Sequence, residues 1–291
     1  MRLGGPLFES FASPRQWVRA LAASGYAAAY CPVSLDADES TIEAYARAAR
    51  QEGVVIAEVG AWSNVLDPDE RRRREALERC RRALTVAEAL EARCCVNIAG
   101  SRGKHWCGPH DKDLTEETFA MIVDTVRGVI DAVKPARTFY TLETMPWLFP
   151  HSTESYRRLI DAVDRPAFAV HFDPVNLLWG PDRVFHNADI MKDFVAALGP
   201  LIRSVHIKDV ILGNEWLCRI DEVEPGKGVL DYPALFSALK NLDPDLPLML
   251  EHLPDHDACG RAAAVVRQTA ERERVPFIEA QRRPGRSHAV S

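Results

Sequence analysis

The sequence alternates between short apolar segments and longer amphipathic ones, and this alternation constrains the fold more than any other feature. Apolar or β-branched runs predict eight strands, at Leu3–Phe8, Tyr26–Val33, Val54–Ala61, Cys94–Ala99, Thr138–Thr144, Phe168–Asp173, Ile202–Val210 and Leu248–Leu253. Helical periodicity predicts eight helices, at Pro14–Ser24, Glu39–Gln51, Glu70–Leu90, Glu116–Ala132, Thr153–Ala162, Ala188–Leu198, Tyr232–Asn241 and Ala258–Glu273. Strands that alternate with helices form parallel sheets. Eight such units in 291 residues predict an α/β protein with a (β/α)8 TIM barrel.

The alternation has no linker-like break, so we predict a single barrel domain over residues 1–275. The segment 276–291 is basic and rich in turn-forming residues, and we expect a tail that is flexible or docks on a neighbouring subunit. The main alternative is an open doubly wound sheet. No GxGxxG or P-loop motif follows the first run, which argues against that alternative.

Composition excludes several classes of protein. The chain has 36 Lys and Arg against 42 Asp and Glu, a formal charge of −6, which does not suit a protein that binds duplex DNA. No apolar run approaches the ~20 residues that span a bilayer. Seven cysteines without a CxxC pair predict buried reduced thiols. We therefore expect a cytoplasmic protein that binds neither nucleic acid nor membranes.

Polar residues stand late in the last four predicted strands, where the apolar pattern leads us to expect burial. They are Glu143, Asp173, His206 and Glu251. The carboxyl ends of barrel strands meet at one mouth, where active sites of this fold lie. Burying carboxylates is costly unless they are paired or bind a metal. Three carboxylates and one imidazole suit Mn²⁺, Mg²⁺ or Co²⁺, with Zn²⁺ as a further option.

The alternative for these four residues is a buried ion-pair network without metal. We favour the metal because few cations lie near these positions in the sequence, Lys208 being the exception.

The pattern of these four residues resembles that of the xylose isomerase-like barrel superfamily. The segments His-Phe-Asp-Pro-Val-Asn at 171–176 and His-Ile-Lys-Asp at 206–209 are similar to it as well. That superfamily includes sugar-phosphate isomerases and epimerases, ketose 3-epimerases, inosose dehydratases and isomerases, and endonuclease IV. The resemblance implies that Glu143, Asp173, His206 and Glu251 are metal ligands. It also implies that Glu143 and Glu251 act as the acid/base pair. Two carboxylates on different strands can remove a proton from one face of a carbon and return it to the other.

The sequence departs from the ketose 3-epimerases at three positions. Asn176 stands where they have a His, Leu212 where they have an Arg, and Phe149 where they have a Glu. We therefore do not expect a free ketohexose as the substrate. The extra His and Asp ligands of endonuclease IV have no convincing counterpart, which argues against DNA repair.

Three polar residues near the predicted ligands are candidates for substrate contact. Lys208 shares a strand face with His206, so it can polarise a substrate oxygen or simply neutralise the carboxylates. His171 shares a face with Asp173 and either lines the site or is a core histidine. Asn176 can donate to a substrate hydroxyl or cap its own loop.

Residues in the segments that follow the strands complete the predicted site. Trp62, Trp106 and Trp147 follow strand ends, where flat apolar rings can cover the C–H face of a sugar or merely anchor loops. Glu222 precedes the Pro-Gly-Lys-Gly turn at 225–228, which resembles the turn before the last helix in this superfamily. We include Glu222 among the candidate substrate contacts, although a structural turn is the alternative.

Three functions are compatible with the sequence. The leading hypothesis is a divalent-metal-dependent isomerase or epimerase of a ketose, keto-inositol or keto-glycoside, which abstracts a proton next to a carbonyl and passes through an enediolate. The second is a lyase or dehydratase acting on an inosose, dehydroshikimate or a 3-keto-glycoside, because it shares that first step. The third is a non-catalytic sugar-binding barrel. The resemblance is also compatible with a homo-oligomer.

Overall fold

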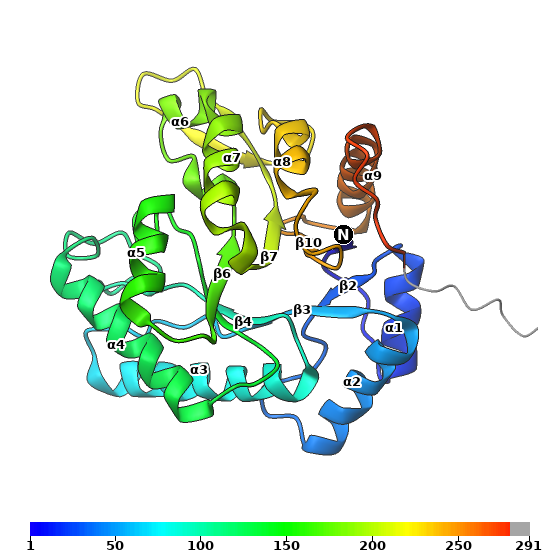
Figure 1. Ribbon diagram of the computed structural model, residues 1–291, viewed down its shortest axis with the longest axis horizontal. Coiled ribbons are helices and arrows are strands. Elements are labelled where there is room, and N and C mark those ends of the chain that lie inside the picture. The colour runs from blue at the N-terminus through cyan, green and yellow to red at the C-terminus, as the bar shows by residue number, and fades with distance from the viewer. Residues whose placement is uncertain (280–291) are drawn as a thin grey trace, which may run out of the picture.

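The computed structural model describes residues 1–279 and contains eight parallel strands in one sheet, with helices around its outside (Figure 1). The strands pair in the order β1-β10-β7-β6-β5-β4-β3-β2, which curves into a nearly closed ring. Their bounds are β1 Arg2–Gly4, β2 Ala28–Tyr30, β3 Val55–Gly60, β4 Cys94–Asn97, β5 Tyr140–Glu143, β6 Phe168–Phe172, β7 Ile202–Ile207 and β10 Pro247–Leu250. The predicted (β/α)8 TIM barrel is confirmed.

The ring closes between β1 and β2, which contact one another without forming a regular ladder. Ala27 donates its backbone N–H to the carbonyl oxygen of Leu3 at 2.9 Å. A Cβ atom on Gly4 would lie 2.5 Å from the carbonyl oxygen of Ala28, so only glycine allows the two backbones to come this close.

Helices return the chain from the end of each strand to the start of the next. Their bounds are α1 Pro14–Ala23, α2 Glu39–Glu52, α3 Glu70–Leu90, α4 Glu116–Val133, α5 Thr153–Val163, α6 Pro181–Phe185, α7 Asn187–Leu198, α8 Tyr232–Leu239 and α9 His256–Arg272. Most begin where a Ser, Thr or Asp side chain accepts a hydrogen bond from a backbone N–H of the first turn, as Ser13, Thr115 and Ser152 do.

Two connections differ from the sequence-based expectation. The segment between β6 and β7 forms two helices, α6 and α7, where one was expected. The predicted strand Ile202–Val210 is divided, because β7 ends at Ile207 and a second strand, β8 (Asp209–Leu212), pairs antiparallel with β9 (Ile220–Val223). This hairpin stands on the carboxyl-terminal side of β7.

The carboxylate of Asp209 fixes the base of the hairpin. It accepts backbone N–H groups of Val210, Gly226, Gly228 and Leu230 at 2.9 to 3.0 Å. One buried side chain therefore joins the start of β8 to the turn that follows β9.

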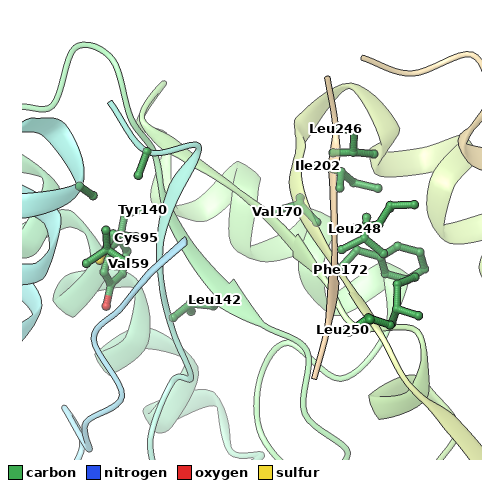
Figure 2. Close-up of a cluster of buried hydrophobic side chains, with 14 of the residues drawn as sticks. Val59, Cys95, Tyr140, Leu142, Val170, Phe172, Ile202, Leu246, Leu248 and Leu250 are labelled. Carbon is green, nitrogen blue, oxygen red and sulfur yellow. The ribbon is translucent and has the colours of Figure 1, made fainter. Parts of the chain in front are cut away.

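The main hydrophobic core lies between the strands and the helices, and Figure 2 shows part of it. Along β6, Phe168, Val170 and Phe172 belong to this core, and Phe172 stacks on Phe194 of α7 with ring centroids 4.3 Å apart. Because successive side chains of a strand alternate between faces, His171 and Asp173 point to the inside of the barrel.

The start of the chain and the segment after α9 lie side by side. The terminal amino group of Met1 donates to the carbonyl oxygen of Pro276 at 2.9 Å, and Ile278 donates to that of Met1 at 2.8 Å. The rest of the predicted tail, from residue 280, lies outside the described residues. All seven cysteines are free thiols. Within residues 1–279, no helix has both the length and the apolar composition needed to cross a bilayer.

Candidate metal and active site

Four consecutive neighbours in the sheet bring the predicted ligands together at the barrel mouth. Glu143 is the last residue of β5, Asp173 directly follows β6, His206 lies in β7, and Glu251 directly follows β10. One potential ligand atom from each residue lies within 4.8 Å of those of the other three. The geometry is therefore that of a site that can hold one cation.

The imidazole of His206 lies in the middle of the group. Its Nδ1 atom is 3.0 Å from Oε1 of Glu143, 2.9 Å from Oε2 of Glu251 and 3.6 Å from Oδ2 of Asp173. A ring nitrogen carries at most one proton, so it cannot donate to all three carboxylates. The carboxylates need a further positive charge.

Lys208 supplies part of this charge. Its Nζ atom lies 2.6 Å from Oε2 of Glu251, 2.8 Å from Oδ2 of Asp173 and 3.6 Å from Oε1 of Glu143. Burial opposes the ammonium charge, but the carboxylates outweigh it and hold the pKa of Lys208 well above its usual value. The sequence-based expectation placed Lys208 beside the ligands, and the structure places it there.

The two carboxylates of the expected acid/base pair have different environments. Burial raises the pKa of Glu143, and the attraction of His206 and Lys208 only partly offsets it. Burial also raises the pKa of Glu251, but the attraction of His206 and Lys208 outweighs this effect and lowers the pKa to about 2. In the protein without metal, Glu143 thus holds a proton more readily than Glu251.

Asn176 positions the carboxylates. Its side-chain amide donates to Oδ2 of Asp173 at 3.0 Å and to Oε1 of Glu143 at 3.2 Å. The backbone N–H of Val175 and that of Asn176 donate to the other oxygen of Asp173. The turn after β6 therefore fixes the direction of Asp173.

Glu58 of β3 is a buried member of the site that the sequence reasoning missed. Its Oε2 atom lies 3.2 Å from Nε2 of His206, and its Oε1 atom lies 3.1 Å from Nε2 of His171. The hydroxyl of Ser204 also donates to Oε1. A charged residue inside the apolar run Val54–Ala61 was the available signal, similar to the one that drew attention to the four predicted ligands.

His171 lies behind His206. Its side chain is fully buried, and its ring centroid is 4.2 Å from that of His206 in an edge-on arrangement. It contacts Glu58, and no contact with Glu143, Asp173 or Glu251 is found for its ring among the described residues.

The predicted tryptophans lie on the loops that follow β3, β4 and β5 and are partly exposed. The exposed fraction is 36% for Trp62, 42% for Trp106 and 38% for Trp147. The indole N–H of Trp147 donates to the carbonyl oxygen of Cys107 at 2.7 Å, so the loops after β4 and β5 are joined.

Glu222 lies on β9 and is linked to the site through His252. Its Oε2 atom is 3.0 Å from Nδ1 of His252, whose Nε2 atom is 3.6 Å from Oε1 of Glu251. The hydrogen bond from His252 to Glu222 raises the pKa of this histidine. His252 was not among the predicted site residues.

Two of the three departures from the ketose 3-epimerases are apolar residues that lie in the hydrophobic core or against it. The ring of Phe149 is buried and packs edge-on against Phe119 with centroids 5.3 Å apart, and Leu212 packs partly buried against the same core. Neither side chain offers a polar group for a substrate hydroxyl.

Solved structures share this fold at low sequence identity. A D-psicose 3-epimerase, determined in the presence of D-fructose, matches with a TM-score of 0.68 and 14% identity, over 95% of this chain and 100% of its own. The 3-keto-D-glucoside 4-epimerase of E. coli matches with a TM-score of 0.65 and 18% identity, over 92% of this chain and 99% of its own. A probable 3-DHS dehydratase of Bacillus anthracis matches with a TM-score of 0.66 and 14% identity, over 91% of this chain and 98% of its own.

No curated protein shows significant similarity to the sequence. At the level of the family the match is clear, because residues 18–271 fit the family described as xylose isomerase-like TIM barrel. This stretch includes every strand from β2 to β10 and all four predicted ligands. The chain therefore belongs to the xylose isomerase-like TIM barrel family.

Proposed function

We propose that the protein is a divalent-metal-dependent isomerase or epimerase that acts on a keto sugar or keto-polyol. The observation that carries this proposal is the convergence of Glu143, Asp173, His206 and Glu251 at the barrel mouth, beside the buried ammonium group of Lys208. Similarity to solved epimerases of the same fold supports it.

The donor set fits a divalent ion. Three carboxylates and one imidazole suit Mn²⁺ best, and Mg²⁺, Co²⁺ and Zn²⁺ are the alternatives. Oε2 of Glu251, Oε1 of Glu143 and Oδ2 of Asp173 all lie close to Nδ1 of His206, so the three carboxylates and the ring nitrogen converge on one point. When bound, the ion would polarise a substrate carbonyl and favour loss of the neighbouring proton.

The protein's own residues would move the proton. Glu143 and Glu251 reach the site from strands separated by β6 and β7, so they can face opposite sides of one substrate carbon. One carboxylate takes the proton from that carbon and the other delivers a proton to the resulting enediolate. Lys208 stabilises the negative charge on the substrate oxygen, and Asn176 orients Glu143 and can donate to a hydroxyl.

We infer that the substrate is a keto-glycoside or keto-inositol rather than a free ketohexose. Phe149 and Leu212 stand where the ketose 3-epimerases have a Glu and an Arg. This chain therefore has no polar side chain at either position. Trp62, Trp106 and Trp147 offer partly exposed aromatic surface on the loops after three strands, which suits the apolar face of a sugar ring. We assign His171 and Glu222 to positioning roles. His171 shares the carboxylate of Glu58 with His206, and Glu222 contacts His252.

A lyase or dehydratase is the second candidate, because it begins with the same proton abstraction. The similarity to a 3-DHS dehydratase of the same fold favours it. The chemistry differs in the next step, in which the enediolate expels a β-hydroxyl or a glycosidic oxygen instead of taking up a proton. A non-catalytic sugar-binding barrel is the least favoured, since it has no use for the buried carboxylates. A cytoplasmic location and a homo-oligomer remain predictions.

Mass spectrometry in D₂O tests the proposal. The protein, loaded with Mn²⁺, is offered ketoses, keto-inositols, 3-keto-glycosides and dehydroshikimate. A gain of one deuterium at unchanged composition is expected of an isomerase or epimerase, whereas loss of water or of an aglycone identifies a lyase. Full turnover in both Glu143→Gln and Glu251→Gln would contradict the acid/base assignment. Glu116→Gln, an exposed carboxylate paired with Arg158, is the control.

A further inference from the structure

His206 is contacted by carboxylates at both nitrogens of its ring. Nδ1 faces Glu143 and Glu251, which belong to the proposed metal site, whereas Nε2 faces Glu58. Glu58 comes from β3, on the far side of the barrel, and is 148 residues away in sequence. Its contact with His206 is thus made only by the folded barrel.

We propose that Glu58 is a positioning residue that determines which nitrogen of His206 binds the metal. By accepting the Nε2 proton, Glu58 leaves the lone pair of Nδ1 directed at Glu143, Asp173 and Glu251. This inference rests on the proposed metal site and adds to it a residue that is not itself a ligand. A histidine that ligates through one nitrogen usually donates its other N–H to such an acceptor, which fixes ring and tautomer.

The surroundings of Glu58 hold its carboxylate in place for this role. The ring of His171 and the hydroxyl of Ser204 both contact Oε1, so Oε2 is left for His206. The side chains of His206 and Glu58 are 0% and 1% exposed, so bulk solvent does not reach their contact.

Glu58, His171 and His206 also lie close enough to hold a metal of their own. The contacts of 3.1 and 3.2 Å between Glu58 and the two rings are those of direct hydrogen bonds. A metal there would compete for His206 with the site at the mouth. We therefore assign the group to hydrogen bonding, and the number of ions bound per chain separates the two arrangements.

The test measures Mn²⁺ affinity by titration calorimetry in full-length variants without any substrate. Glu58→Leu removes the acceptor, and we expect its Kd to rise by ~10- to 100-fold, the usual effect of losing such a partner. Glu58→Gln keeps an amide oxygen as a weaker acceptor, so its Kd is expected between those of Glu58→Leu and the wild type. Glu116→Gln, at an exposed carboxylate of α4 that pairs with Arg158, is the control, for which we expect less than a threefold change.

A spectroscopic measurement distinguishes positioning from a general loss of structure. Long-range ¹H–¹⁵N spectra of the Zn²⁺-loaded wild type should show His206 protonated at Nε2, and Glu58→Leu should show a mixture of tautomers or loss of the ligand. If Glu58→Leu does not fold, Glu58→Gln decides. A wild-type Kd and an unchanged tautomer in the folded variant would overturn the inference, as would two ions per wild-type chain with one lost on substitution.

Because the test requires no turnover, it is separate from the test of the proposed function. A protein that binds Mn²⁺ through His206 and depends on Glu58, but exchanges no substrate proton, would contradict the proposed reaction and leave the role of Glu58 standing.

Discussion

The Nζ atom of Lys208 lies 2.6 Å from Oε2 of Glu251, a carboxylate that we propose as both metal ligand and proton carrier. The same ammonium group is 2.8 Å from Asp173. A divalent ion and Lys208 would therefore share these oxygens, and two positive charges in one buried site repel each other. Lys208 should weaken metal binding even though catalysis needs it.

Lys208→Met should separate the two effects. We expect Mn²⁺ to bind about tenfold more tightly, because removing the ammonium group removes its repulsion of the ion. Turnover should fall at the same time, because the charge that stabilises the substrate oxygen is lost. Calorimetry and the D₂O assay measure the two quantities, and Lys192→Met, on the exposed surface of α7, is the control. Weaker Mn²⁺ binding in Lys208→Met would mean that Lys208 supports the ion.

Metal removal should lower the thermal stability of the barrel. A ligand at about 100 times its Kd stabilises the folded state by ~2.7 kcal/mol, provided that the unfolded chain does not bind it. For a chain of this size that corresponds to roughly 4–5 °C in Tm. Calorimetric scans with EDTA and with Mn²⁺ should differ by this amount in the wild type. The difference should disappear in Asp173→Asn, and equal Tm values in the wild type would argue against a metal site.

The hydroxyl of Tyr156 should contribute measurably to stability. It donates to the carbonyl oxygen of Leu142 at 2.6 Å and accepts the N–H of His171 at 3.1 Å, and so links β5 to β6. Tyr156→Phe leaves these buried groups unsatisfied, so we expect a loss of about 1–3 kcal/mol in the free energy of unfolding. Urea denaturation measures it. Tyr45→Phe, at a hydroxyl without a hydrogen bond to any of residues 1–279, should change the value by less than about 0.5 kcal/mol.

The ion pair between Glu224 and Arg261 predicts a pH-dependent contribution to stability. Arg261 and Lys227 lower the pKa of Glu224 from 4.5 to about 2. A carboxylate with a lowered pKa stabilises the folded state above its ordinary pKa, and the contribution is lost as pH falls through the lowered value. The wild type should therefore exceed Glu224→Gln in stability above pH 4.5, and the difference should shrink down to pH 2. Denaturant unfolding across this range measures it, and a constant difference would contradict it.

The fold and the predicted ligands were accessible from the sequence for the same reason. A parallel barrel strand buried on both sides leaves a short apolar run, and a charged residue at its carboxyl end is conspicuous. Glu251 directly follows the apolar run 247–250, and Glu143 follows Leu142 at the end of a run of apolar residues and threonines. Asp173 follows the run 168–172, in which His171 is the one polar residue. Since all barrel strands end at one mouth, their proximity followed from the fold alone.

The contacts of Glu58 and the hairpin were not accessible in the same way. The partners of Glu58 lie 113 and 148 residues further along the chain, and no local pattern records that a side chain from β3 crosses the barrel interior. The division of the run Ile202–Val210 depends on Asp209, whose carboxylate binds backbone groups 17 to 21 residues away. Local periodicity contains no information on such long-range hydrogen bonds.

The hydrogen bonds of Asp209 make the base of the β8–β9 hairpin different from its tip. The base is held by one buried carboxylate, whereas the tip between Leu212 and Ile220 carries Trp216 fully exposed. Lys208 directly precedes Asp209. The hydrogen bonds of Asp209 therefore hold the backbone beside Lys208 in place, whatever residues the tip contains. The tip is therefore an insertion point for protein engineering. A peptide tag or a fluorescent reporter grafted there would sit near the mouth of the barrel and leave the chemistry beneath it undisturbed.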